Sequence, residues 1–225
     1  EYDLFSELSH FQRNNGTEEK TSRLHAEPTL LSPLNFSSFN VTSEVKLMQT
    51  WYQQDSGENE ESISRTLPQF KLYADVDFER PLKFTPGFTQ TLTPKVQYLY
   101  VPYEDQQDIG IYDTALLRDD YSGLFRERRF SGLDRIVDTN QVTLGMTTTI
   151  KDENNRPKFT ASIGQTFCLE RSKLFEEQGD SDEIFPDRSS LAGELSYSIN
   201  NQWELNHAMQ LNEQQSSVTQ SKSTL

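Results

Sequence analysis

The stretch that decides the fold runs from Thr66 to Glu79 and reads TLPQFKLYADVDFE. Its even-numbered residues from Phe70 to Phe78 are apolar, whereas its odd-numbered residues from Gln69 onward are mostly charged or polar. A period of two places the two sets on opposite faces of a β-strand. This stretch is therefore predicted to be a strand with one apolar and one polar face.

The same alternation recurs along the whole chain, and no long segment shows the apolar spacing of an amphipathic helix. We expect about ten strands in total. Besides residues 66–79, the predicted strands are 2–13, 21–31, 41–53, 88–101, 140–151, 158–170, 191–199, 202–212 and a last one that begins near 218.

The predicted connections alternate between short turns and longer polar loops. The short ones, at 32–35, 80–87, 152–156 and 200–201, are rich in Pro, Gly, Asn and Asp, and the longer ones lie at 14–20, 55–62, 104–139 and 172–189. In a meander, every second connection lies at the same end of the sheet. Tight turns at one end and loops at the other are typical of an outer-membrane barrel. The sequence thus predicts an all-β fold, an antiparallel up-and-down transmembrane β-barrel segment.

A soluble barrel or sandwich is the alternative, in which the apolar face would pack into a core. The period alone does not separate the two. Long strands, and aromatic rings near strand ends such as Trp51, Tyr98 and Trp203, favour the membrane interpretation. The polar residues would then face a hydrated lumen. The candidate lumen-facing residues are Glu44, Lys46, Lys71, Asp75, Asp77, Lys95, Gln97, Thr143 and Thr147.

The composition argues against several other classes of protein. Lys and Arg number 21 against 35 Asp and Glu, a net charge of −14, so a nucleic-acid partner is not expected. No apolar run approaches the roughly 20 residues of a membrane-spanning helix. Cys168 is the single cysteine, which rules out an internal disulfide or a multi-cysteine metal site. The three histidines are scattered and no phosphate-binding loop is present, so we predict no enzyme and no cofactor.

Four motifs between residues 85 and 149 are distinctive: YLYVPY at 98–103, Tyr112-Asp113, DYSGLF at 120–125 and GLDRI at 132–136. Shorter pieces flank them: HAEPTL at 25–30, TWYQQ at 50–54, PQFK at 68–71 and ASIGQ at 161–165. Together these residues resemble the barrel of the LptD family of lipopolysaccharide-assembly proteins. The resemblance covers nearly the whole chain.

The resemblance implies that residues 1–225 are part of one C-terminal transmembrane barrel domain in the Gram-negative outer membrane, about ten strands of a larger barrel. It implies a chain without the family's N-terminal periplasmic domain. The function it implies is that of a translocon component that inserts and assembles lipopolysaccharide at the cell surface, with the barrel as a conduit around a lipoprotein plug. A passive porin-like channel and a soluble carbohydrate-binding β-barrel or sandwich are the alternatives.

Several partners follow from the same resemblance. They are lipopolysaccharide, the lumen lipoprotein plug (LptE-type), outer-membrane lipids and a periplasmic bridge protein (LptA-type), which the missing N-terminal domain would contact. The structural cysteines of the family lie outside this stretch, so Cys168 is expected to form no disulfide.

The long segment 104–139 concentrates arginines in an otherwise acidic chain. They are Arg118, Arg126, Arg128, Arg129 and Arg135, interleaved with acidic residues. Arginine pairs with carboxylates and phosphates through two parallel hydrogen bonds. We expect one of two roles. The arginines contact lipopolysaccharide phosphates or the plug, or they form an internal salt-bridge network that folds the segment over the pore.

Overall fold

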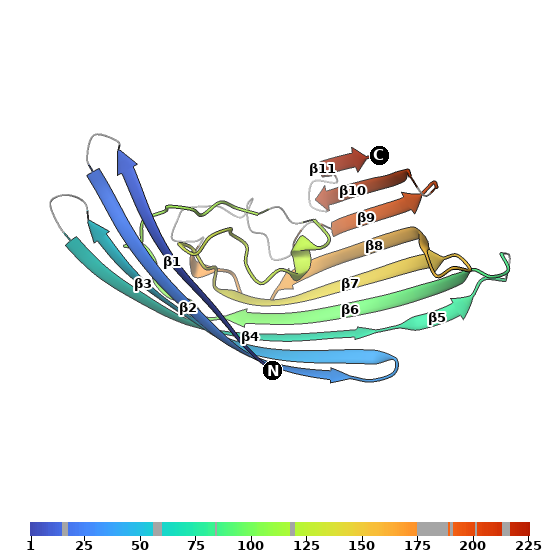
Figure 1. The fold of residues 1–225 in the computed structure, drawn as a ribbon, viewed down its shortest axis with the longest axis horizontal. Coiled ribbons are helices and arrows are strands. Elements are labelled where there is room, and N and C mark those ends of the chain that lie inside the picture. Colours follow the sequence, from blue (N-terminus) through green and yellow to red (C-terminus); the bar gives the residue numbers. More distant parts are fainter. Residues whose placement is uncertain are drawn as a thin grey trace.

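The computed structural model describes residues 1–14, 18–55, 60–83, 85–117, 120–174, 189, 191–200, 202–212 and 217–225. Its main feature is one antiparallel sheet of eleven strands (Figure 1). The strands are β1 (Tyr2–Asn14), β2 (Glu18–Asn35), β3 (Phe39–Asp55), β4 (Glu60–Val76), β5 (Phe78–Pro81), β6 (Thr89–Val101), β7 (Thr139–Lys151), β8 (Pro157–Cys168), β9 (Leu191–Ser198), β10 (Glu204–Asn212) and β11 (Ser217–Thr224). Among the described residues, no helix has the length and apolar character needed to cross a membrane.

The sheet follows the chain order from β1 to β11, so each strand pairs with its neighbours in sequence and the predicted up-and-down fold is confirmed. β4 and β5 count as one strand of the meander, because both pair with β6 and the register does not change between them. Asp75 lies opposite Lys95 in the first pair, and Phe78 lies opposite Leu92 in the second. The single predicted strand 66–79 is therefore interrupted only at Asp77.

The predicted bounds of two long loops are wrong. β1 ends at Asn14 and β2 begins at Glu18, while β3 ends at Asp55 and β4 begins at Glu60. Residues 14, 18–20, 55 and 60–62, predicted to lie in loops 14–20 and 55–62, instead extend the ladders, because backbone pairing does not require apolar side chains. Residues 15–17 and 56–59 lie outside the described residues. The predicted turn 32–35 likewise belongs to β2. The long connections are 102–138 and 169–190, which lie at the same end of the sheet because β6 and β8 run in the same direction.

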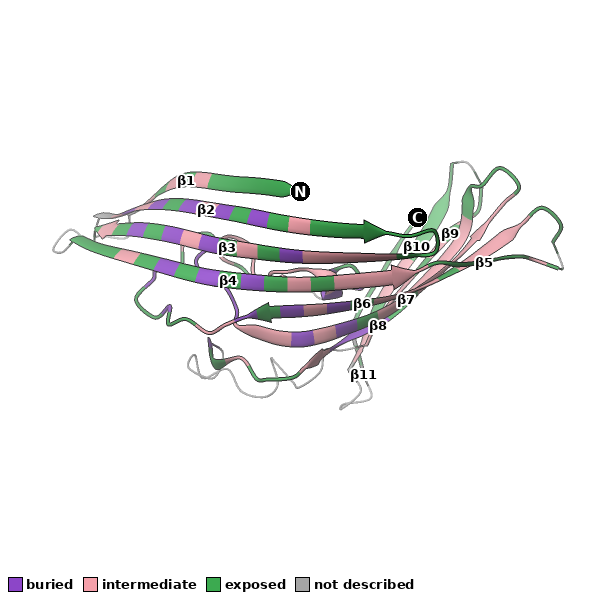
Figure 2. Ribbon diagram, turned by 90° about the horizontal axis from the view of Figure 1, so that it is seen from below, coloured by how far each residue is buried: buried purple, intermediate pink, exposed green. Residues whose placement is uncertain are grey.

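The two faces of the sheet have the opposite polarity to a soluble sandwich. Along β2, Arg23, His25 and Glu27 are buried, whereas Leu24 between them is 47% exposed. The alternation of buried and exposed residues continues along β3 and β4 (Figure 2). On β8, Ile163 is 45% exposed, as a side chain that faces lipid would be in the isolated chain. We call the face that carries the buried polar residues the inner face. This polarity supports the membrane interpretation.

The segment between β6 and β7, residues 102–138, folds back over the inner face (Figure 1). It contains η1, a short 3-10 turn (Gly123–Phe125). Small apolar clusters form between this segment and the strands. One joins Ile136 to Met48 and Leu67, and another joins Tyr121 and Leu124 to Ala192. The segment thus supplies the contacts that bury the inner face.

Candidate functional site

Arg23 of β2 is the centre of the first ionic cluster between the sheet and segment 102–138. Its side chain is 1% exposed. Nη1 donates to Asp134 Oδ1 at 2.7 Å and to Asp113 Oδ1 at 3.0 Å, and Nη2 donates to Asp113 Oδ2 at 2.6 Å and to Glu7 Oε1 at 2.7 Å. The pair with Asp113 uses both guanidinium nitrogens, the strong fork geometry of arginine. One arginine therefore joins β1, β2 and two points of the segment.

Asp134 and Asp113 fix the local path of the segment. Asp134 is fully buried, and its Oδ2 accepts hydrogen bonds from the backbone N–H groups of Tyr112 at 2.7 Å and Asp113 at 2.9 Å. The hydrogen bond from Arg23 lowers the pKa of the Asp113 carboxyl below its ordinary value, against the effect of its burial. The Asp113 carboxylate is therefore held as an anion beside Arg23.

Arg65 of β4 holds the same part of the segment through backbone carbonyls. It is 1% exposed. Its Nη2 donates to the carbonyl of Leu133 at 2.5 Å, and Nη1 donates to the carbonyl of Asp134 at 3.0 Å and to Gln106 Oε1 at 2.7 Å. Gln106 in turn accepts from the N–H of Ile136 at 2.9 Å. Buried carbonyls away from regular structure need such donors. Arg65 therefore lets this irregular backbone lie against the inner face of the sheet, and we call the sheet the wall.

Glu127 is the centre of the second ionic cluster. It accepts hydrogen bonds from Lys46 of β3 at 2.6 Å and from Lys71 of β4. Lys71 also pairs with Glu44 at 2.7 Å, and Lys46 pairs with Glu27 at 3.0 Å. Burial alone would raise the pKa of the Glu127 carboxyl, but hydrogen bonds from the two lysines outweigh it and lower that pKa to about 2. Glu127 therefore holds the segment as an anion at neutral pH.

His25 connects the two clusters within the wall. It is fully buried, with Nδ1 2.8 Å from Thr50 Oγ1 and Nε2 2.8 Å from Glu27 Oε2. Thr50 also accepts from Arg65 at 3.4 Å, while Glu27 accepts from Lys46. The polar residues of β2, β3 and β4 thus form one continuous network beneath the segment.

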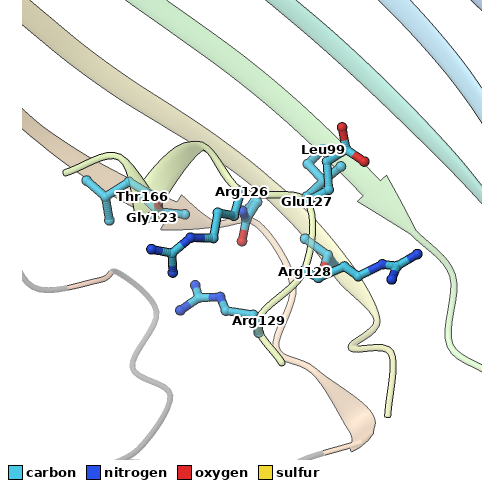
Figure 3. Close-up of a pocket in the computed structure, with 10 residues that line it drawn as sticks. Leu99, Gly123, Arg126, Glu127, Arg128, Arg129 and Thr166 are labelled. Atoms are coloured by element: carbon cyan, nitrogen blue, oxygen red, sulfur yellow. The ribbon is translucent and has the colours of Figure 1, made fainter. Parts of the chain in front are cut away.

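The structure places the candidate arginines in different surroundings. Arg128 pairs with Glu27, Arg126 pairs with Asp120 at 3.0 Å, and Arg135 is buried and donates to the carbonyl of Asp134 at 3.1 Å. Arg126, Arg128 and Arg129 line one small pocket, where Arg126 and Arg129 lie on one side of the segment and Arg128 on the other (Figure 3). Arg118 lies outside the described residues. The ion pairs of Arg126 with Asp120 and of Arg128 with Glu27 fit the internal-network interpretation.

The candidate lumen-facing residues lie on the inner face, apart from Asp77 at the strand interruption. Four contact segment 102–138 by hydrogen bonds: Lys46, Lys71, Thr143 and Thr147. Glu44 and Gln97 are buried, and Asp75, which lies opposite Lys95, accepts a hydrogen bond from Asn40 at 2.9 Å. Asp77 is exposed and accepts from Thr93 at 2.6 Å. That these side chains face a lumen stays a prediction.

Sequence reasoning missed the central roles of Arg23, Arg65 and His25. A usable signal existed for two of them, because residues 21–29 carry a polar residue at every odd position. Arg65 lies one residue before the predicted strand 66–79. The acidic partners Asp113 and Asp134 lie about 90 and 111 positions beyond Arg23, so spacing alone could not assign them.

An antiparallel wall that exposes apolar side chains and buries charged ones beneath a folded-back connection defines the outer-membrane β-barrel class. The family model described as "LptD: LPS transport system D" matches residues 1–225. The chain therefore belongs to the LptD family, as the sequence motifs indicated, and its location is the Gram-negative outer membrane.

Three relatives show the extent of the similarity, and each is named "LPS-assembly protein LptD". The chain is 45% identical to that of Pseudoalteromonas atlantica over 224 residues, and this alignment covers 98% of the chain and 29% of the relative. It is 46% identical to that of Shewanella oneidensis, covering 91% and 28%, and 40% identical to that of Sodalis glossinidius, covering 97% and 30%. The chain thus spans less than a third of the length of these relatives.

Proposed function

We propose that this chain is part of the wall of a translocon that inserts and assembles lipopolysaccharide at the cell surface. The observation that carries the proposal is the family match over all 225 residues, to relatives that are named for this activity. The charged inner face covered by its own connection supports it. On this proposal residues 1–225 are part of one C-terminal transmembrane barrel domain, and the protein moves its substrate without chemical change.

The two faces of the wall would have separate roles. The apolar outer face contacts the lipids of the outer membrane, and the polar inner face lines a hydrated lumen. Segment 102–138 fills part of that lumen. Beside it, a cavity of about 780 Å³ opens between Tyr121 and strands β8 to β11. Its lining includes Ser162, Glu194, Ser196 and Asn206. We propose that the hydrated lumen, of which this cavity is one part, shelters the lipoprotein plug (LptE-type) and the sugar portion of lipopolysaccharide.

The energy and the supply of substrate would come from outside this chain. For the whole protein we propose an N-terminal periplasmic domain that receives lipopolysaccharide from a bridge protein (LptA-type). A passive porin-like channel would need an open pore and no tight lumen partner. The docked segment favours the conduit over the passive channel, because it covers charged wall residues that a simple aqueous pore would leave hydrated.

The test uses the full-length protein in cells depleted of their own copy. Glu194→Arg places a bulky cation on the wall of the cavity, and Glu153→Arg in the turn between β7 and β8 is the matched control. We expect Glu194→Arg to reduce both the copurified lipoprotein and the newly made lipopolysaccharide labelled at the cell surface. The control should leave both unchanged. Normal surface lipopolysaccharide after depletion of the full-length protein would refute the proposed function.

A separate experiment distinguishes the two roles expected for the arginines of the segment. Replacing Arg126, Arg128 and Arg129 together by alanine removes the cations that line the small pocket. If these residues contact lipopolysaccharide phosphates or the plug, then plug binding or surface lipopolysaccharide should fall while the barrel still assembles. Preserved plug binding together with normal export would refute that role and favour an internal salt-bridge network.

A further inference from the structure

Two glycines form a notch in the inner face of the wall. Gly145 of β7 and Gly164 of β8 lie directly opposite each other in the register, so their missing side chains leave one continuous gap. The flanking inner-face positions of β7, Thr143 and Thr147, carry side chains. We call the gap at Gly145 and Gly164 the glycine notch.

Residues 120–125 of the long segment, which we call the aromatic turn, fill this notch. A Cβ atom added at Gly145 would lie 2.7 Å from Cζ of Phe125 and 3.0 Å from the hydroxyl of Tyr121. A Cβ atom at Gly164 would lie 2.9 Å from the carbonyl oxygen of Leu144 in the neighbouring strand, 3.1 Å from Cε2 of Tyr121 and 3.3 Å from Cδ1 of Leu124. The 2.7 Å separation at Gly145 is far shorter than an ordinary carbon contact, so the turn can rest here only because residue 145 is glycine, and Gly164 leaves the turn room beside it.

The aromatic turn has little freedom to move away from an added methyl group. The ring of Phe125 packs edge-on against Tyr121 at 5.7 Å and against Tyr73 at 6.3 Å between ring centres. The hydroxyl of Tyr121 lies 2.9 Å from Thr147 Oγ1, and Thr143 donates to the carbonyl of Leu124 at 3.2 Å. Thr143 and Thr147, which flank Gly145 on β7, therefore hold the turn by hydrogen bonds on both sides of the notch.

We propose that the glycine notch is the docking site that fixes segment 102–138 along the wall, through shape and apolar contact instead of charge. It acts separately from the ionic clusters, which hold the segment at β2, β3 and β4 while the notch holds it at β7 and β8. Tyr121 also lines the large cavity, so the position of the turn sets one boundary of that cavity. This inference concerns the fold of the segment and stands whether or not the chain assembles lipopolysaccharide.

The first experiment uses full-length protein purified as a folded barrel. Gly145→Ala adds one methyl group to the notch. Gly193→Ala on β9 is the matched control, because a Cβ atom there has its nearest neighbours at an ordinary 3.7 Å. Limited trypsin digestion reports on docking of the turn, since Arg126 directly follows Phe125 and pairs with Asp120 of the same turn. We expect Gly145→Ala to speed cleavage at Arg126 by about tenfold or more, and Gly193→Ala to leave the rate unchanged.

A second variant separates docking from folding. Phe125→Ala leaves the wall intact and removes the ring that the new methyl group would meet, so it should speed cleavage even if Gly145→Ala fails to assemble. With Phe125→Ala in place, Gly145→Ala should add less than about a twofold change, because the two substitutions act on one contact. Cleavage of folded Phe125→Ala at the wild-type rate would overturn the inference. So would an equal effect of Gly145→Ala with and without the ring.

Discussion

Replacing Asp134 by asparagine is the sharpest test of the first ionic cluster. Asp134 Oδ1 accepts from Arg23 at 2.7 Å, while Oδ2 accepts from the backbone N–H groups of Tyr112 and Asp113. The asparagine side chain has the same size but carries one oxygen and one NH₂ group. In one orientation its NH₂ group faces the Arg23 guanidinium, and in the other it faces the backbone N–H groups of Tyr112 and Asp113. The substitution therefore removes a charge and also creates a clash between donors.

The magnitude follows from the burial of the pair. Asp134 is fully buried and Arg23 is 1% exposed, so neither group recovers its hydration while the segment stays docked. Removing one partner of a buried ion pair costs about 3–5 kcal/mol. Taking the lower value because asparagine keeps one acceptor, about 3 kcal/mol corresponds to roughly a hundredfold larger population of the undocked segment.

Amide hydrogen exchange of the folded full-length protein measures that population. The N–H of Ile136 is a suitable probe, because it donates to Gln106 at 2.9 Å and does not touch the substituted carboxylate. Its exchange should become about a hundredfold faster in Asp134→Asn. Asp105→Asn is the control in the same segment, since Asp105 is exposed and accepts a single hydrogen bond from the N–H of Gln107. Exchange of Ile136 at the same rate in both variants would refute the reasoning.

Three further outcomes are expected. The pKa of Glu127 is lowered to about 2 from 4.5, so docking of the segment should be constant above pH 4.5 and weaken as the pH falls from 4.5 toward 2. Amide exchange measured between pH 4.5 and 2 should show a smaller loss of docking in Glu127→Gln than in the wild type. An equal loss in both proteins would contradict the role of the Glu127 carboxylate. Arg65→Lys loses the fork that spans two carbonyls, so exchange in the segment should rise by about tenfold; unchanged exchange would count against its role. Val96→Arg on the outer face should destabilise the barrel in lipid vesicles by about 2–4 kcal/mol if it lies near the bilayer centre, as measured by urea unfolding, whereas Lys95→Arg on the inner face should not.

The fold could be predicted because its physical cause is local. Each strand has an apolar and a polar set of residues at a period of two, and the stretch 66–79 is enough to reveal it. Strand ends were less predictable. β2 runs from Glu18 to Asn35, well past the predicted 21–31. Residues 18–20 are polar on both faces and residues 32–35 have the composition of a turn, so only the ladder with β1 and β3 shows that they belong to the strand.

The candidate site was predictable in outline only. The inner-face position of residues such as Lys46 and Lys71 follows from strand parity, and the excess of arginines in segment 104–139 indicated a charged contact. The sequence could not show that Glu127, between those arginines, is the residue that reaches both lysines. Nor could it show the glycine notch, because Gly145 and Gly164 become neighbours only through the β7–β8 register. Pairing across the sheet is a property of the folded chain.

The inner face explains why the segment needs two kinds of contact. The second ionic cluster brings Glu27, Glu44 and Glu127 together with Lys46, Lys71 and Arg128, so three negative charges meet three positive ones. Buried ion pairs of this kind contribute little net stability, because their desolvation offsets their attraction, but they penalise any displacement that leaves a charge unpaired. Contact between apolar groups supplies stability with little direction. The ionic clusters would therefore select the docked position, while the aromatic turn in the glycine notch would stabilise it. High salt should therefore weaken docking of the segment in Gly145→Ala by no larger a factor than in the wild type, because the notch contact that the variant loses carries no charge.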